Sequence, residues 1–275
     1  MYLTNSDFSS AVSDGYTNSG HTVHDSRAAA FYGEPPNSFE NEILASIPPD
    51  IVEDMRPFFR RIKVFKEQFL FQQDDEVDCI YFPETAILSE FHLLEDGRMV
   101  EVALTGRDGV IGISSVFCCD QVPNCVQVIQ SGTVLQIEAS RMKKIVAKYP
   151  DLPEILFGTL ENYIRQLSQK VVCNMYHSLE SRFCTWLLRF NDRSRRKVLK
   201  LTHEQLAKVL GVYRPSVTCI ALAMKERSAI DYSRGGLSIT DRPQLERYAC
   251  GCYHEFNGNA YHLSPSPRSL RALPV

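Results

Sequence analysis

The chain of 275 residues contains no apolar run of the ~18–20 residues that a membrane-spanning helix needs. Its first residues, MYLTNSDFSS, have neither the basic start nor the apolar core of a secretory signal. These absences predict a cytoplasmic protein with no membrane partner.

Motifs of the common enzyme classes are absent as well. The sequence has no glycine-rich loop that would cradle a phosphate, no HExxH and no GxSxG. Its seven histidines and nine cysteines fall in no catalytic arrangement. We therefore expect no catalytic residue and no enzyme activity.

The cysteines are odd in number and scattered, which predicts reduced thiols rather than a disulfide framework. Cys118, Cys119 and Cys125 lie close together, but no second CxxC and no nearby histidine supports a metal site there. Cys250 and Cys252 form an equally weak pair. The sequence predicts no metal ligand, and it leaves a redox or metal role of these five cysteines open.

Charge is distributed unevenly along the chain. Between Arg189 and Arg247 there are 13 Lys and Arg against 6 Asp and Glu, a local charge of +7, although the whole chain carries −3. A basic module beside an acidic one is typical of a nucleic-acid reader with a separate sensing domain. An ordinary uneven surface is the alternative.

The pattern of the chain predicts an α+β protein in several parts. Residues 1–38 and 257–275 are expected to form a disordered arm and a disordered tail. Between them, apolar residues at helical spacing (Ile43, Leu44, Ile47, Ile51 and Met55) precede short alternating runs separated by turn signals. The region 39–150 is therefore expected to hold an antiparallel roll or barrel. Asp96-Gly97 predicts a type I′ hairpin within it, with positive φ at both residues.

A long helix is predicted over 151–177, with Asp151 at its cap, Pro153 at its second position and Glu154 at its third. A narrow apolar stripe follows its length, and the remaining surface is polar. We interpret the stripe as a dimer seam, and packing on the helix's own domain is the alternative. The predicted dimer residues are Leu156, Leu160, Tyr163, Leu167 and Val171.

Residues 201–218, LTHEQLAKVLGVYRPSVT, predict a helix-turn-helix. Thr202 and Gln205 have the spacing of a capping box, and Leu201 and Leu206 that of a hydrophobic staple. Gly211 is expected to end the first helix in a left-handed conformation. Arg214 is expected at the cap of the second helix, because Pro215 disfavours helical geometry at the preceding residue.

One side of the second helix is apolar, and the other is free to enter the major groove of DNA. Two short strands around Gly235-Gly236 follow, with Arg234 at the tip of their hairpin, where it would meet a phosphate. This order of elements predicts a winged helix-turn-helix over 178–256.

With these elements in this order, residues 40–255 resemble the Crp/Fnr family of bacterial transcription regulators. The resemblance rests on YFPETAILSEFHLLEDGRMVEVALTGRDGVIG, on the helix after Pro150, on LTHEQLAKVLGVYRPSVT and on IDYSRGGLSITDR. It implies a cyclic-nucleotide-binding-like β-roll over 39–150, a dimerisation helix over 151–177 and a C-terminal winged helix-turn-helix. It also implies a homodimer on a palindromic operator of double-stranded DNA, with half-sites ~34 Å apart, and RNA polymerase as a candidate partner.

The resemblance places the base-reading end of the recognition helix on Arg214, Pro215, Ser216, Thr218 and Cys219. Arg214 is the foremost candidate, because a guanidinium pairs with guanine O6 and N7. Thr202, His203 and Arg234 are the phosphate candidates. Relatives often have an acidic residue in place of Pro215 and an arginine in place of Cys219, so the operator sequence does not transfer.

The family's cyclic-nucleotide motif is missing. Cyclic-nucleotide binders of this fold have a Gly-Glu pair and an Arg-Ser/Thr step, whereas this chain has Gly112-Ile113 and Asn124-Cys125. A buried cyclic phosphate would then have no arginine partner. No cysteine precedes Cys79, so the N-terminal cluster of the oxygen-sensing branch is missing too, and His92 is expected to be an ordinary strand residue. We expect no cofactor and no cyclic AMP binding of the usual kind.

The predicted function is a homodimeric, sequence-specific DNA-binding regulator in which a signal at the β-roll alters DNA binding. The alternative is a sensor or scaffold whose winged helix contacts proteins. The effector, the operator, the target genes and the choice between activator and repressor stay open.

Overall fold

The computed structural model describes residues 36–118, 120–233 and 236–254. The predicted arm, apart from its last three residues, and the whole predicted tail lie outside the described residues. Arg234 and Cys119 lie outside them as well.

Two short helices and a helical turn come first: α1 (Glu42–Ser46), α2 (Pro49–Met55) and η2 (Arg56–Phe58). Asn41 caps α1, because its side chain accepts hydrogen bonds from the backbone N–H groups of Ile43 and Leu44. The apolar positions predicted from the sequence are all buried in one cluster with the roll: Ile43, Leu44, Ile47, Ile51 and Met55.

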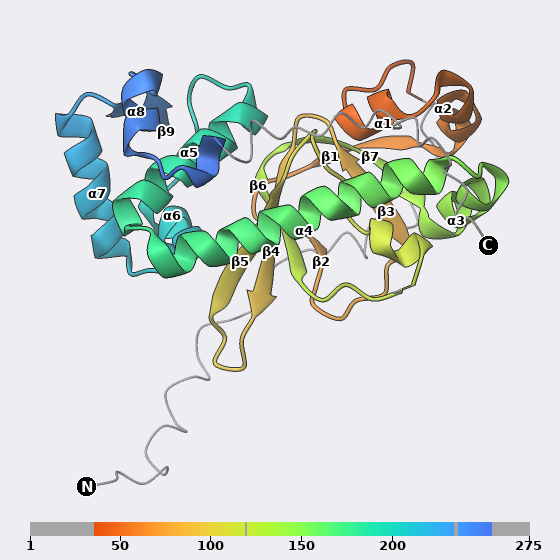
Figure 1. Ribbon diagram of the computed structural model, residues 1–275, viewed down its shortest axis with the longest axis horizontal. Helices are drawn as coiled ribbons and strands as arrows, with labels where there is room; N and C mark the ends of the chain where they lie inside the picture. Colours follow the sequence, from red (N-terminus) through yellow and green to blue (C-terminus); the bar gives the residue numbers. More distant parts are fainter. Residues whose placement is uncertain (1–35, 119, 234–235, 255–275) are drawn as a thin grey trace, which may run out of the picture.

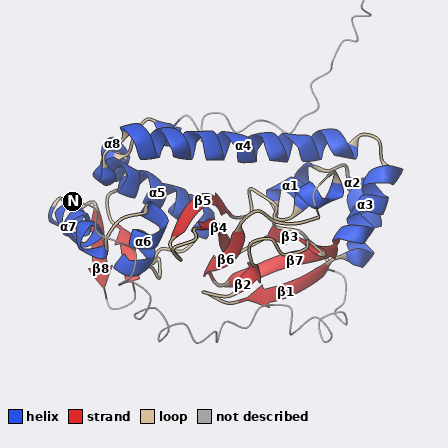
Figure 2. Ribbon diagram, turned by 90° about the horizontal axis from the view of Figure 1, so that it is seen from below, coloured by secondary structure: helices blue, strands red, loops and turns tan. Residues whose placement is uncertain are grey.

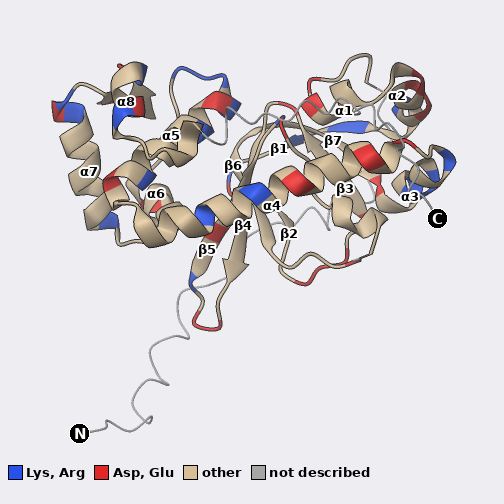
Figure 3. Cartoon of the chain, in the orientation of Figure 1, with Lys and Arg blue, Asp and Glu red and all other residues tan. Residues whose placement is uncertain are grey.

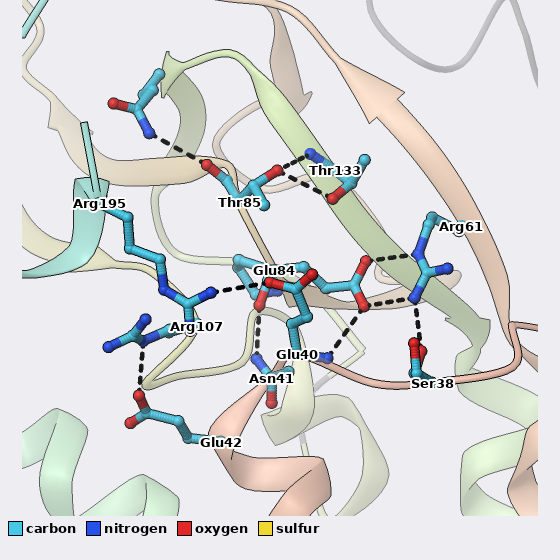
Figure 4. Close-up of polar contacts among 12 residues, drawn as sticks. Ser38, Glu40, Asn41, Glu42, Arg61, Glu84, Thr85, Arg107, Thr133 and Arg195 are labelled. Atoms are coloured by element: carbon cyan, nitrogen blue, oxygen red, sulfur yellow. Dashed lines mark hydrogen bonds and ion pairs between the residues drawn. The ribbon is translucent and has the colours of Figure 1, made fainter.

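Charged pairs fasten this opening segment to the rest of the chain (Figure 4). Arg61 and Glu84 of the roll pair with each other at 2.7 Å, and they hold the opening segment because Arg61 donates to the Ser38 carbonyl at 2.6 Å and Glu84 accepts from the Glu40 backbone N–H at 3.2 Å. Glu42 pairs with Arg107 at 2.7 Å. Glu40 pairs at 3.0 Å with Arg195, which comes from the C-terminal part of the chain.

The roll contains two antiparallel sheets. One has the strand order β1-β7-β3 and the other β2-β6-β4-β5. A short helical turn, η3 (Ile113–Val116), lies between β5 and β6. The strands are β1 (Arg60–Val64), β2 (Phe69–Phe71), β3 (Cys79–Pro83), β4 (Ile87–Leu93), β5 (Met99–Thr105), β6 (Cys125–Gln130) and β7 (Gly132–Glu138).

The β4–β5 hairpin forms where it was predicted, but its turn is not the predicted type I′. Gly97 has a φ of +81°, whereas Asp96 is not among the residues with positive φ. The Asp96 carboxylate instead accepts hydrogen bonds from the backbone and the guanidinium of Arg98. The five-residue connection between β4 and β5 therefore needs only one left-handed residue, and the glycine supplies it.

Helix α3 (Ala139–Lys148) leads into α4 (Leu152–Tyr176), which crosses the whole molecule (Figure 1). As predicted, Asp151 is the N-cap and Pro153 lies in the first turn, although the Asp151 side chain makes no capping hydrogen bond. Figure 2 shows α4 running over the roll at one end and over the C-terminal helices at the other.

The C-terminal part contains α5 (Leu179–Ser194), α6 (His203–Leu210), α7 (Arg214–Glu226), β8 (Ile230–Ser233), β9 (Gly236–Ile239) and α8 (Arg242–Tyr248). It shares a core cluster with the roll, to which Ile87, Phe91, Leu104 and Ile129 contribute. Polar contacts also join the roll to the C-terminal part: Arg193 pairs with Asp108 at 2.5 Å, and Ser194 donates a hydrogen bond to Gln130 at 2.5 Å. The predicted α+β architecture of roll, long helix and winged helix-turn-helix is confirmed.

Candidate nucleic-acid interface and sensor cavity

The helix-turn-helix is built by the local signals seen in the sequence. Thr202 accepts from the Gln205 backbone at 3.1 Å, and the Gln205 side chain accepts from the Thr202 backbone at 3.1 Å. Gly211 ends α6 with a φ of +66°. Helix α7 begins at Arg214 after an N-cap at Tyr213, so the predicted cap at Arg214 is wrong by one residue. Proline is tolerated at the second helical position because no intrahelical partner exists there for its missing N–H.

Among the described residues, no single helix is long and apolar enough to cross a membrane. Helices α6 and α7 together have the length and apolar composition of a membrane span, but their axes are bent by 111° relative to each other. That angle is typical of a helix-turn-helix.

Helix α7 has one packed side and one open side. Val217, Ala221 and Met224 are buried against the core. Four of the five predicted base-reading residues lie on the open side and are exposed: Arg214, Pro215, Ser216 and Cys219. Thr218 is half-buried, and its hydroxyl bonds to His203 Nδ1 at 3.0 Å and donates to the Arg214 carbonyl at 3.1 Å. Its hydroxyl is thus engaged within the helix-turn-helix.

The phosphate candidates differ in their surroundings. Thr202 is exposed at the start of α6, with its hydroxyl engaged in the cap. His203 packs edge-on against the Tyr232 ring, and burial, followed by the charge of Arg214, lowers the pKa of its imidazole. Both effects favour the neutral form of the imidazole.

Strands β8 and β9 form the predicted hairpin, pairing from Ile230 with Ile239 to Ser233 with Gly236. Its core is continuous with the helix-turn-helix, since Ile230 and Leu237 are buried in the same cluster. Figure 3 shows Lys and Arg on α6, on α7 and on the loop after α5. In that loop Arg195, Arg196, Lys197 and Lys200 are exposed.

A cavity of about 780 Å³ lies between the roll and α4. Its wall includes residues 108–114, the segment in which the cyclic-nucleotide motif was sought. Gly112 must be glycine in this wall: its φ is +82°, and a Cβ there would lie 2.9 Å from Val77. Asn124 points into the roll, within 3.2 Å of His92.

The cavity is lined by more acidic than basic groups. Asp74, Glu76, Glu90, Asp108 and Asp120 contribute carboxyl groups to it. Among the described lining residues Arg193 is the only Lys or Arg, and its guanidinium is held by Asp108. The site therefore offers no basic group that is uncommitted to a carboxylate and could bind a phosphate.

Comparison with known proteins agrees with this geometry in both halves of the chain. The family model described as the cyclic nucleotide-binding domain matches residues 61–149. The model described as the Crp-like helix-turn-helix domain matches residues 181–248. The chain belongs to the Crp/Fnr family.

Curated relatives of this Crp/Fnr protein are transcriptional regulators rather than enzymes. It is 22% identical over 193 residues to the transcriptional activator protein Anr of Pseudomonas protegens, covering 68% of this chain and 79% of Anr. It is 19% identical to the anaerobic regulatory protein of Bacillus subtilis, covering 78% of this chain and 92% of that protein. The structure of FixK2 from Bradyrhizobium japonicum superposes with a TM-score of 0.61 at 15% identity, covering 70% of this chain and 98% of that one.

The predicted dimer residues of this Crp/Fnr regulator do not share one exposed face. Leu156 is fully buried in the chain's own core, so its assignment to a dimer seam is wrong. Leu160 packs against the same core, and Tyr163 donates a hydrogen bond to Glu90 of β4 at 2.8 Å. Leu167 is half-buried, and only Val171 is exposed. Helix α4 buries the N-terminal part of its predicted stripe because the roll already covers that side.

The exposed apolar side chains of α4 form a neighbouring stripe, which includes Val171 but none of the other predicted dimer residues. Phe157, Ile164 and Val171 recur every seven residues and are 53%, 60% and 57% exposed, and Met175 follows them at 68%. Sequence reasoning placed the stripe about 65° away around the helix, and the two stripes share only Val171. It also missed Tyr213, which is 86% exposed beside the base-reading residues. Leu222, on the open side of α7, is 55% exposed.

Proposed function

We propose that this Crp/Fnr protein is a homodimeric, sequence-specific DNA-binding transcription regulator that acts in the cytoplasm, with RNA polymerase as a candidate partner. The observation that carries the proposal is the open side of α7. There Arg214, Ser216 and the large side chains of Tyr213 and Leu222 stand exposed on a helix whose other side is packed. Surfaces of this kind enter the major groove.

The signal is proposed to enter at the cavity between the roll and α4. The residues there favour an uncharged or cationic ligand, because five carboxyl groups face a single arginine that is already paired. A cyclic nucleotide would place its phosphate in this acidic wall without a bidentate partner. Tyr163 belongs to α4 and bonds to Glu90 in the wall, so a ligand at Glu90 acts directly on the long helix.

DNA selection from a random library tests the main proposal. We expect the wild-type protein to enrich a palindrome, and the logarithm of its affinity to fall linearly as the logarithm of salt rises. Arg214→Ala should weaken binding to the selected site by about 1–3 kcal/mol and relax the preference at one position in each half-site. Arg141→Ala, at the opposite end of the molecule, is the matched control. Enrichment of no sequence, together with binding that ignores salt, would instead favour a winged helix that contacts proteins.

The exposed stripe of α4 is proposed as the dimer seam. An aspartate at Ile164 would lie at the interface in both copies, and we expect it to raise the dimer dissociation constant by about 10–100-fold. Phe65→Asp is the control, because Phe65 is also exposed, at 65%, but lies in the loop after β1. Sedimentation velocity across a range of protein concentrations measures both. Equal dissociation constants for Ile164→Asp and the wild type would remove α4 from the interface.

A further inference from the structure

Four potential metal ligands come together where α4 meets the C-terminal part of the chain. They are Cys173 in the last turns of α4, His177 immediately after that helix, and Cys250 and Cys252 in the turn after α8. The Sγ and imidazole nitrogen atoms all lie within 4.8 Å of one another. Among the described residues, no other group of three or more His, Cys, Asp or Glu is as close. The sequence left a metal role of Cys250 and Cys252 open but did not connect them with Cys173 and His177, because 77 residues separate Cys173 from Cys250.

Two separations among the four atoms agree with a single tetrahedral ion. The Sγ atoms of Cys173 and Cys250 are 3.7 Å apart, and Cys252 Sγ lies 3.5 Å from His177 Nδ1. In a tetrahedral zinc site, with Zn–S bonds of about 2.3 Å and Zn–N bonds of about 2.0–2.1 Å, these separations are about 3.8 and 3.5 Å. An iron–sulfur cluster distributes its ligands over several irons and would hold these atoms further apart.

Hydrogen bonds from neighbouring residues hold the four ligand residues close together. Cys173 and His177 are four residues apart, which puts both on one side of α4 and its end. Cys250 donates its backbone N–H to Thr185 Oγ1 at 3.0 Å, and the same hydroxyl lies 3.1 Å from Cys250 Sγ. Tyr253, next to Cys252, donates to Asp192 of α5 at 2.9 Å. A hydroxyl aimed at a ligand sulfur is a common support of a metal site.

The three sulfur atoms are also buried. Cys173, Cys250 and Cys252 are 6%, 6% and 5% exposed and form an apolar cluster of their own.

We propose that Cys173, His177, Cys250 and Cys252 bind one structural zinc ion. Each cysteine loses its thiol proton to solvent as its Zn–S bond forms, and histidine binds through its neutral Nδ1. Four protein ligands close the coordination sphere, which is typical of a structural rather than a catalytic site. The ion joins the end of α4 to the residues after α8, beside the short connection between α4 and α5. It therefore holds the DNA-reading part against the long helix, and this last consequence rests on the proposed function.

The test begins with the intact wild-type protein, purified under reducing conditions without chelator. Elemental analysis should find about one zinc per chain. X-ray absorption at the zinc edge should give three sulfurs at about 2.3 Å and one nitrogen at about 2.0–2.1 Å. Cobalt, added after zinc is removed, should give the intense visible bands of a tetrahedral thiolate site. None of these results depends on DNA binding, so they stand or fall separately from the proposed regulatory function.

Variants then assign the ligands. Thr185→Val removes a supporting hydroxyl and should reduce zinc affinity by about 10–100-fold. Cys252→Ala removes a ligand and should reduce zinc affinity by more than that. Cys184→Ala is the matched control, since Cys184 is a buried cysteine of α5 whose Sγ lies 3.7 Å from Met224. It should keep its zinc.

Three results would overturn the proposal. The first is a wild-type protein that takes up neither zinc nor cobalt while all its thiols are reduced. The second is iron with labile sulfide in place of zinc. The third is a Cys173–Cys250 disulfide, found by mass spectrometry in protein kept under reducing conditions.

Discussion

Replacing Glu101 by alanine is expected to lower the free energy of unfolding by about 3–5 kcal/mol. Glu101 lies in β5 with only 3% of its surface exposed. Its carboxylate pairs with Lys170 of α4 at 2.9 Å and accepts a hydrogen bond from Ser89 of β4 at 2.7 Å. It also accepts from the Trp186 indole of α5 at 2.9 Å. One carboxylate therefore connects the roll, the long helix and the C-terminal part.

The size of the effect follows from what the alanine leaves behind. The Lys170 side chain is only 17% exposed, and its ammonium would lose its counter-ion in a largely buried site. The Trp186 N–H would lose its acceptor, and an unsatisfied buried donor costs about 1–3 kcal/mol. Glu101→Gln keeps an acceptor for the indole but not the charge, so its loss of stability should be intermediate.

Urea denaturation at one fixed protein concentration measures these variants, because dimerisation would make stability depend on concentration. Glu95→Ala is the matched control: Glu95 is an exposed glutamate in the same hairpin, and its loss should cost about 0.5 kcal/mol or less. If Glu101→Ala cost no more than the control, the carboxylate would not connect the three parts.

Local order was predictable from sequence because its causes lie close together in the chain. The capping box of Thr202 and Gln205 and the left-handed Gly211 involve residues only a few positions apart, and the structure has both. The buried side of α7 followed from its helical period in the same way. The Asp96-Gly97 hairpin was located correctly, although its turn type was wrong, because Arg98 binds Asp96 and competes with the assumed geometry.

Residues whose role depends on contacts with residues far away in the sequence could not be predicted. Helix α4 carries apolar side chains on two neighbouring stripes, and its period could not decide which stripe the roll covers. Leu156 is buried in the core and Ile164 is exposed because the rotation of α4 about its own axis turns the Leu156 side toward the roll. The Cys173 and Cys250 sulfurs meet only because α8 returns the chain to the end of α4. No spacing rule within a short motif would have found either result.

The cavity also contains a group whose charge changes near neutral pH, and this leads to a second large effect. Burial raises the pKa of Glu90 to about 7, although hydrogen bonds from Tyr163 and Asn124 oppose the shift. Because the folded protein binds this proton more tightly than the unfolded chain, the resulting stability is complete below about pH 4.5. It is lost as the pH rises through about 7. The difference between these limits corresponds to about 3 kcal/mol.

Glu90→Gln should therefore be more stable than the wild type at pH 8, by about 2–3 kcal/mol, and nearly equal to it at pH 4.5.

The other ionisable groups in the cavity wall include Asp74, Glu76, Asp108, Asp120 and Arg193, and both proteins keep them. Glu76→Gln is the control, since its side chain is exposed on the same wall and its replacement should change stability by about 0.5 kcal/mol or less. Urea denaturation at closely spaced pH values measures all three proteins. A wild-type curve parallel to that of Glu90→Gln from pH 4.5 to 8 would mean that Glu90 is not protonated in this range. If the predicted divergence is found, a proton on Glu90 accompanies its contact with Tyr163, so a ligand that displaces this proton would also act on α4.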